Sequence, residues 1–190
     1  MDQEEREIRI KLRDDFRHYS SKCLKIRTKF GGDKFIMNRA QQYVHDIAED
    51  QKSRTGKVRI IVLKGRQQGM STLIGGRYYW LVTHNEGARA FILTHDGEAT
   101  NNLFDMTQRY HQNCPKAVRP LADTSNAKEL YFGGLDSGYK VGTAGNKGVG
   151  RSSTIQYLHG SEVAFWANAA EHSKGIMQAV PNARGTEIFL

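Results

Sequence analysis

Short apolar segments of β-type sequence alternate with helical segments along most of this 190-residue chain. The strand-like runs cover residues 58–63, 90–94, 129–132, 154–158 and 187–190. Helical patterns at residues 71–83 and 97–112 separate the first three runs. Such an alternation is typical of a mainly parallel sheet with helices on both faces. The sequence therefore predicts an α/β fold in which ligands bind beyond the carboxyl ends of the strands.

Two further helical patterns precede the first strand, at residues 4–21 and 37–50, on either side of Gly31 and Gly32. In each pattern, apolar side chains recur at helical spacing among charged ones, which is typical of a helix that packs through one face. We find no internal repeat, low-complexity tract or Pro-rich linker, and the length suits one domain. We therefore treat residues 1–190 as a single domain.

The charge composition indicates which kinds of partner the chain could bind. The chain has 28 Lys and Arg against 20 Asp and Glu, a formal net charge of +8. Basic side chains favour polyanions because phosphates release counterions when Lys and Arg bind them. No apolar run approaches the roughly 20 residues that cross a bilayer, and Cys23 and Cys114 lack the spacing of a disulfide framework or a zinc site. We expect a cytoplasmic protein with no membrane partner.

The segment VRIIVLKGRQQGMST joins a buried-type strand to a helix through a glycine-containing loop. This is the context of a phosphate-binding P-loop, in which backbone N–H groups and the helix dipole hold phosphate oxygens. Gly69 and Ser71 match the consensus G-x-x-x-x-G-K-[ST], but Met70 stands at the lysine position. Lys64, at the position of the first glycine, and Arg66 are then the candidate cations for the phosphates. An ordinary strand-to-helix turn with solvated basic side chains is an equally good interpretation of the loop alone.

Three other short motifs surround this loop. Upstream, the pattern F-x-x-N-x-x-Q occurs at Phe35, Asn38 and Gln41. Downstream, a glycine-rich stretch ends at Arg151, and the segment TIQYLHGSEVAFW that follows contains Glu162. In order and spacing, the four motifs together resemble the large terminase subunit of tailed bacteriophages over most of the chain. The resemblance implies an ASCE-type P-loop NTPase fold preceded by N-terminal helices, with ATP and Mg²⁺ as cofactors.

The resemblance also implies which residues would bind these cofactors. The phosphate loop would comprise Lys64, Gly65, Arg66, Gln67, Gln68, Gly69, Met70, Ser71 and Thr72. On the adenine side, the Gln41 amide would read the edge of the base, next to Phe35. The hydroxyl of Ser71 would bind Mg²⁺, and Ser161 would contribute weakly because it replaces the usual aspartate.

The catalytic candidates implied by the resemblance are Glu162, Arg66 and Arg151. Glu162 would orient and polarise the attacking water. Arg151 would act in trans, as an arginine finger that reaches the γ-phosphate in a neighbouring subunit of a ring. Taken alone, each residue has a simpler interpretation: Glu162 as a carboxylate at a helix start, Arg151 as a solvated loop arginine, and Gln41 as a polar residue on an exposed helix face.

The resemblance further implies a domain organisation. Residues 1–56 would form an N-terminal helical, adenine-side segment, and residues 57–190 the P-loop core of one ATPase domain. The domain would be truncated at its C-terminus, within the strand that follows the Glu162 motif, and the nuclease domain of the family would be absent. Glu187 is a lone acid near that end, so we assign no DNA cleavage to these residues.

The implied function is that of a packaging motor, which couples ATP hydrolysis to the translocation of double-stranded DNA into a procapsid. The implied partners are double-stranded DNA, the portal protein, the small terminase subunit, the procapsid and further copies of the chain in a ring. The expected location is the cytoplasm of a host cell that carries the phage or prophage. Two alternatives stay open: a basic DNA-binding module with a degenerate, inactive nucleotide site, and a helicase-type P-loop ATPase.

Overall fold

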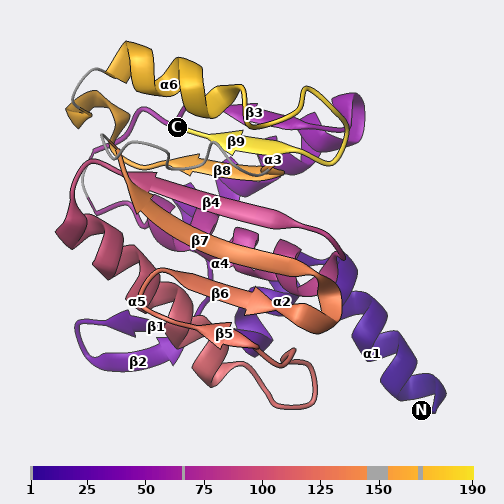
Figure 1. Ribbon diagram of the computed structural model, residues 1–190. Helices are drawn as coiled ribbons and strands as arrows, with labels where there is room; N and C mark the ends of the chain where they lie inside the picture. The colour runs from indigo at the N-terminus through magenta and orange to yellow at the C-terminus, as the bar shows by residue number, and fades with distance from the viewer. Residues whose placement is uncertain (1, 66, 145–153, 167–168) are drawn as a thin grey trace.

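The computed structural model describes residues 2–65, 67–144, 154–166 and 169–190, which form a seven-stranded sheet with helices around it (Figure 1). The strands of the sheet are β3 (Val58–Ile60), β4 (Arg89–Thr94), β5 (Thr124–Ser125), β6 (Glu129–Phe132), β7 (Ser137–Thr143), β8 (Tyr157–Gly160) and β9 (Glu187–Phe189). The helices are α1 (Gln3–Asp14), α2 (Phe16–Cys23), α3 (Arg39–Thr55), α4 (Met70–His84), α5 (Gly97–Asn113) and α6 (Ala169–Met177), with short 3₁₀ turns η1 (Gly133–Leu135) and η2 (Val163–Phe165). A separate hairpin consists of β1 (Lys25–Thr28) and β2 (Gly31–Lys34).

The sheet has the strand order β3-β9-β8-β4-β7-β6-β5. The strands from β3 to β7 in this order run parallel, and β6 and β5 add an antiparallel edge. The predicted α/β fold with a mainly parallel sheet is therefore confirmed. β9 lies between β3, which leads into the glycine-containing loop, and β8, which leads to Glu162. The parallel strands all end at one edge of the sheet, on the left in Figure 1.

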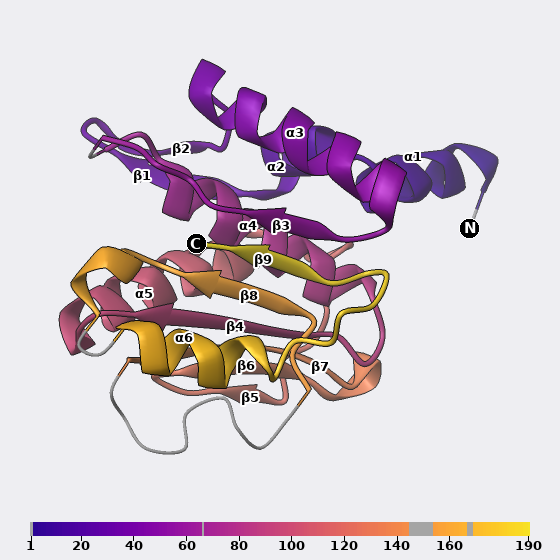
Figure 2. The ribbon, with the colours of Figure 1, turned by 90° about the horizontal axis from the view of Figure 1, so that it is seen from above.

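Alternate residues of the central strand β4 face two separate hydrophobic cores. Ala90 and Ile92 belong to the larger core, which includes side chains of α4 and α5. Phe91 and Leu93 belong to the smaller core, which includes Ile176 of α6. Figure 2 shows α6 on the opposite side of the sheet from α4 and α5. Because both faces of β4 are buried, its sequence is a continuous apolar run without polar alternation.

Helix α4 is buried on nearly all sides because it lies between the sheet and the N-terminal segment. Of its 15 residues, 12 are buried, which is why its sequence lacks a polar stripe. A Cβ at Gly76 would lie 3.1 Å from Leu24 and 3.2 Å from Phe35, so glycine lets the N-terminal segment approach closely. The indole N–H of Trp80 donates to the carbonyl of Leu12 (2.9 Å). The N-terminal segment thereby holds α4, and the loop before it, against the sheet.

The predicted single helix at residues 4–21 is wrong, because the chain breaks into α1 and α2 at Asp15. Asp15 is extended, and its carboxylate accepts a hydrogen bond from the backbone N–H of His18 (2.9 Å). An aspartate side chain that bonds to the nearby backbone in this way interrupts a continuous helix and caps the helix that follows. After α2, Gly31 at φ +115° turns the β1–β2 hairpin, where the sequence indicated only a break.

Other boundaries differ from the predictions by a few residues. Only Val58–Ile60 of the run at 58–63 forms a strand, and the run at 154–158 begins before β8. Strand β7 was not predicted, because its sequence SGYKVGT contains two glycines and a lysine, which are poor strand formers. Its pairing with β4 over six registered residue pairs outweighs that propensity. Within the part of the chain that the structure describes, no helix is both long and apolar enough to cross a membrane.

Candidate active site

The loop between β3 and α4 lies at the carboxyl edge of the sheet and is exposed. Past β3, the N–H of Val62 still donates to the carbonyl of Leu190 (2.8 Å), so the chain leaves the sheet only after that point. Gln67 (φ +61°) and Gly69 (φ +73°) are both left-handed, and α4 begins at Met70 without a side-chain cap. Free N–H groups at a helix start, preceded by left-handed turns, form a concave donor surface that suits an anion.

Gln41 connects helix α3 to this loop. It is 4% exposed, and its amide oxygen accepts from the backbone N–H of Asn38 (2.9 Å), which completes a capping box at the start of α3. Its Nε2 donates to the carbonyl of Gly69 (2.7 Å). Gln41 is therefore not a polar residue on an exposed face. It uses one donor and one acceptor to fix the last residue before α4.

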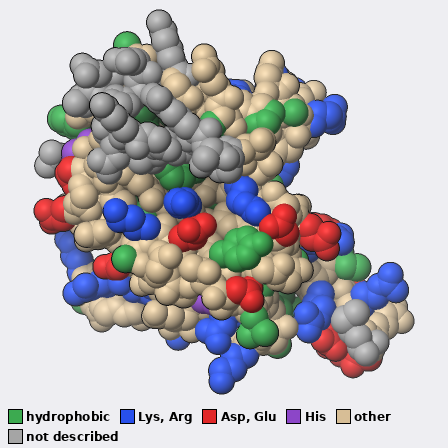
Figure 3. Space-filling model, viewed as in Figure 1, with side chains coloured by type: hydrophobic (Ala, Val, Ile, Leu, Met, Phe, Trp, Pro, Cys, Tyr) green, Lys and Arg blue, Asp and Glu red, His purple; other side chains and the backbone are tan. Residues whose placement is uncertain are grey.

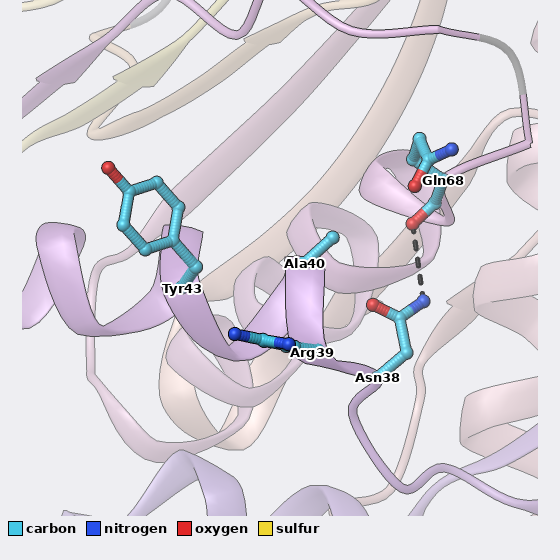
Figure 4. A pocket seen from close by; sticks show the side chains of 5 residues that line it. All are labelled: Asn38, Arg39, Ala40, Tyr43 and Gln68. Carbon is cyan, nitrogen blue, oxygen red and sulfur yellow. Dashed lines mark hydrogen bonds between the residues drawn. The ribbon is translucent and has the colours of Figure 1, made fainter.

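Two adjacent cavities lie beside the loop and share Ala40, Tyr43 and Gln68. One has a volume of about 540 Å³ and is also lined by Asn38 and Arg39 (Figure 4). In Figure 4, Asn38 reaches the backbone carbonyl of Gln68 (3.4 Å), while the Tyr43 ring lies farther along α3.

The other cavity has a volume of about 420 Å³ and separates α3 from the chain that leaves β3. The residues that complete its lining are Val44, Ile47, Ile60, Ile61, Val62, Leu63, Lys64, Gly65 and Met70. Exposed Tyr43, Ile61 and Leu63, together with half-buried aliphatic side chains, provide apolar surface next to the glycine-containing loop. A flat apolar group joined to an anion would fit this combination.

Phe35 does not line either cavity. Its ring is fully buried and packs edge-on against Phe16, with ring centroids 6.5 Å apart. The expected contact of Phe35 with a base is thus not supported by its position, and its side chain instead belongs to the larger core. The phenylalanine of the F-x-x-N-x-x-Q pattern therefore has a packing role.

Glu162 projects from the turn after β8. The N–H of the preceding Ser161 donates to the carbonyl of Leu93 (2.8 Å), so the β4–β8 ladder continues to the residue before Glu162. Glu162 is left-handed (φ +55°), and 45% of its side chain is exposed. It lies directly at the start of η2, as the simpler interpretation of a carboxylate at a helix start expects, but its side chain makes no cap there. A left-handed backbone at a residue other than glycine is typical of a functional position.

His95 and Asp96, which the sequence analysis did not identify, lie directly beside Glu162. His95 Nε2 is 2.6 Å from the Asp96 carboxylate, and Nδ1 is 3.3 Å from Oε2 of Glu162. The signal was present in the sequence, because polar residues that follow a buried strand, as His95 and Asp96 follow the run at 90–94, are candidates for a site.

His159 lies on β8 below the loop, with its ring buried. Burial lowers the pKa of His159 to about 3, and the positive charge of Lys64 adds to this effect. Nδ1 of His159 has no hydrogen-bond partner among the described residues. The ring is therefore neutral at pH 7. The charge of Lys64 acts on this ring, so the glycine-containing loop and the end of β8 interact electrostatically.

Two site candidates, Arg66 and Arg151, fall outside the described residues. Ser71 lies in the first turn of α4 and Ser161 at the end of β8, both half-buried. A hydrated Mg²⁺ needs few protein oxygens, so a hydroxyl at the start of α4 fits such an ion. Within the described ranges, no group of three or more His, Cys, Asp or Glu side chains could hold a metal.

The surface charge is mixed on the face shown in Figure 3. Lys and Arg side chains lie there beside Asp and Glu, apart from the region that grey atoms cover. The positive net charge thus does not form one continuous basic patch on the visible part of this face.

Comparisons with known proteins identify the fold. No family model matches the chain, and no curated protein does. Among solved structures, the crystal structure of the HK97 bacteriophage large terminase matches with a TM-score of 0.75 and 13% sequence identity. The match covers 93% of this chain but 36% of that terminase chain. The chain therefore has the fold found in a phage large terminase, as the sequence motifs led us to expect.

Proposed function

We propose that this chain is the ATP-hydrolysing motor domain of a DNA-packaging terminase, which couples hydrolysis to the translocation of double-stranded DNA into a procapsid. One observation carries the proposal: a left-handed, glycine-containing loop and an uncapped helix start occur in a terminase fold, at the sheet edge that also bears Glu162. The 13% identity supports the fold alone, so the activity rests on the geometry of this edge.

In this proposal, the phosphates of ATP bind the backbone N–H groups at the start of α4, with Lys64 and Arg66 as counter-charges. The base lies against the apolar cavity beside Tyr43. Ser71, with a weaker contribution from Ser161, would hold Mg²⁺, and the ion would there supply positive charge for the β- and γ-phosphates. Glu162 orients the attacking water in line with the γ-phosphate and accepts its proton.

The proposed partners are those of a packaging motor: double-stranded DNA, the portal protein, the small terminase subunit and the procapsid, in the host cytoplasm. Self-association into a ring would bring Arg151 of one subunit to the γ-phosphate in its neighbour. The chain spans about a third of the length of the HK97 terminase that it matches.

The first test of the proposal is calorimetric titration of Mg-ATPγS into the 190-residue chain. We expect binding that Lys64→Ala and Arg66→Ala each weaken by about tenfold or more, because each removes a charge-assisted contact. Lys116→Ala, which removes an exposed lysine from the turn after α5, should bind like the wild type. Glu162→Gln should bind normally but not hydrolyse ATP.

Absence of nucleotide binding by the wild-type chain would contradict the proposal. Salt-sensitive DNA binding in the same sample, with no effect of nucleotide, would then favour the basic DNA-binding module with an inactive site. Normal turnover by Glu162→Gln would instead remove the role assigned to that carboxylate.

A further inference from the structure

We infer that His95 is a positioning residue, which holds the Glu162 carboxylate at the carboxyl end of β8. The inference deepens the proposed ATPase function and depends on it for its consequence. Its basis is geometric: Nε2 of His95 lies 2.6 Å from the carboxylate of Asp96, and Nδ1 lies 3.3 Å from Oε2 of Glu162. Nδ1 is buried and has no hydrogen-bond partner among the described residues, so its 3.3 Å approach to Glu162 is an ion-pair contact that a small movement of the carboxylate would turn into a hydrogen bond.

Backbone hydrogen bonds fix the main-chain positions next to His95 and Glu162. β4 and β8 are parallel neighbours, and their ladder extends through the bond from Ser161 N–H to the Leu93 carbonyl (2.8 Å). On the other side of β4, the N–H of Ala144 donates to the carbonyl of Thr94 (2.8 Å). His95 and Glu162 are thus the first residues beyond the hydrogen-bonded ends of adjacent strands.

The other partner of His95 is itself immobilised. Oδ1 of Asp96 accepts from the Ala99 N–H (2.7 Å) and caps α5. The carbonyl of Asp96 accepts from the hydroxyls of Thr94 (2.9 Å) and Thr100 (2.8 Å). Asp96 is therefore immobilised and holds the imidazole of His95 in place. The imidazole in turn restricts the position of the Glu162 carboxylate.

Glu162 has few other constraints on its position. Its side chain is 45% exposed, and no residue other than His95 pairs with it within the described ranges. The ring of Phe165 lies near that of His95, with the two ring centroids 6.0 Å apart. A general base must lie within hydrogen-bond reach of its water, and small displacements cost large factors in rate. Without His95, the exposed carboxylate would sample several rotamers.

The contact itself can be tested by ¹H–¹⁵N correlation spectra of the histidine rings in the 190-residue chain. Signals of His95 are identified by their loss in His95→Asn. Glu162→Gln should move the His95 ring signals more than those of any other histidine. Glu86→Gln, an exposed acid at the opposite end of β4, should leave them in place. Unchanged His95 signals in Glu162→Gln would overturn the inference, whatever the activity of the chain.

The consequence for chemistry is tested by single-turnover hydrolysis of Mg-ATP with the chain in excess. His95→Ala should slow hydrolysis by about 10- to 100-fold, with unchanged affinity for Mg-ATPγS. His95→Asn should recover part of the rate, because its amide can donate from near the position of Nδ1. Asp96→Asn, which keeps the cap of α5, should have an intermediate rate.

The outcomes separate the inference from the proposed function. If Glu162→Gln abolishes hydrolysis while His95→Ala keeps the wild-type rate or exceeds it, His95 does not position the carboxylate. If the wild-type chain does not hydrolyse ATP, or if Glu162→Gln hydrolyses it normally, the proposed function fails, and the ring spectra alone decide whether His95 holds Glu162.

Discussion

His159 is a titratable side chain in an apolar environment. It pairs in register with Ile92 and Phe189 in the middle of the sheet, where a strand side chain is normally aliphatic. Burial, reinforced by Lys64, lowers its pKa to about 3, so the folded protein holds the ring in its neutral form. The unfolded chain binds a proton at this histidine near its ordinary pKa of about 6.5.

This difference predicts a pH-dependent stability. The contribution of neutral His159 is complete above about pH 6.5 and is lost as the pH falls toward 3, because the unfolded state then binds more protons. Between pH 7 and pH 5, we expect the wild type to lose up to about 2 kcal/mol of unfolding free energy that His159→Leu does not lose. Urea denaturation of both proteins at the two pH values measures the difference.

Other histidines with lowered pKa values do not affect that comparison. The pKa values of His45, His84 and His111 are lowered, each mainly by burial. These residues contribute equally to both proteins, so the difference between them isolates His159. Equal pH slopes for the two proteins would show that His159 is not buried as the structure has it.

At the scale of elements, the junction between β3 and α4 depends on Gly69. Its φ of +73° is unfavourable for residues with a side chain, and a Cβ there would lie 2.7 Å from Nε2 of Gln41. The same glycine accepts the hydrogen bond that connects α3 to the loop. A substitution at Gly69 would therefore disturb the junction of β3 and α4 and the contact of this junction with α3.

We expect Gly69→Ala to lower the unfolding free energy by about 1–3 kcal/mol, from backbone strain and displacement of Gln41. The affinity for Mg-ATPγS should fall with it. Gly97→Ala is the matched control, because Gly97 begins α5 with open space around it and no positive φ. Alanine there should be neutral or stabilising. Similar stabilities of the two variants in chemical denaturation would contradict this description of the junction.

At the scale of the whole molecule, a buried ion-pair cluster connects α3, α4 and β9. Arg77, at 1% exposure, donates from Nε and Nη2 to the two carboxylate oxygens of Glu187 (2.7 Å each) and from Nη1 to Glu49 (2.5 Å). Burial by itself lowers the pKa of Arg77, but these carboxylates outweigh it and raise the pKa overall. Glu187, a lone acid in the sequence, thus has a structural partner on the central helix.

Removal of one charge from this cluster should destabilise the fold as a whole. We expect Glu187→Gln to cost about 3–5 kcal/mol, because Arg77 stays buried with incomplete compensation. Asp50→Asn removes a partner of Arg54 in an exposed pair of α3 and should cost less than about 0.5 kcal/mol. Thermal unfolding of both variants tests this, and a Glu187→Gln protein as stable as Asp50→Asn would contradict it.

Local patterns were sufficient for some elements, but α6, β1, β2 and β5 were not predicted. The apolar run of β4 and the periodicity of α5 predicted these elements within one residue at each end, since neighbouring residues determine burial and capping there. The break at Asp15 could have been predicted from the local sequence, because the Asp15 side chain bonds to the backbone only three residues ahead. The predictions failed where distant strands decide, as in β7, whose glycines and lysine form a strand only beside β4.

The sequence by itself determined the α/β fold, the placement of the glycine-containing loop between β3 and α4, and the position of Glu162 after a buried strand. Those features depend on the order of apolar and glycine residues along short segments. Only the tertiary structure decided that β9 lies between β3 and β8, that Gln41 holds Gly69, and that His95 meets Glu162. Each of these arrangements joins segments 28 or more residues apart, which no local pattern encodes. Strand pairing places β9 between β3 and β8 and brings His95 to Glu162, whereas the packing of α3 beside the loop brings Gln41 to Gly69.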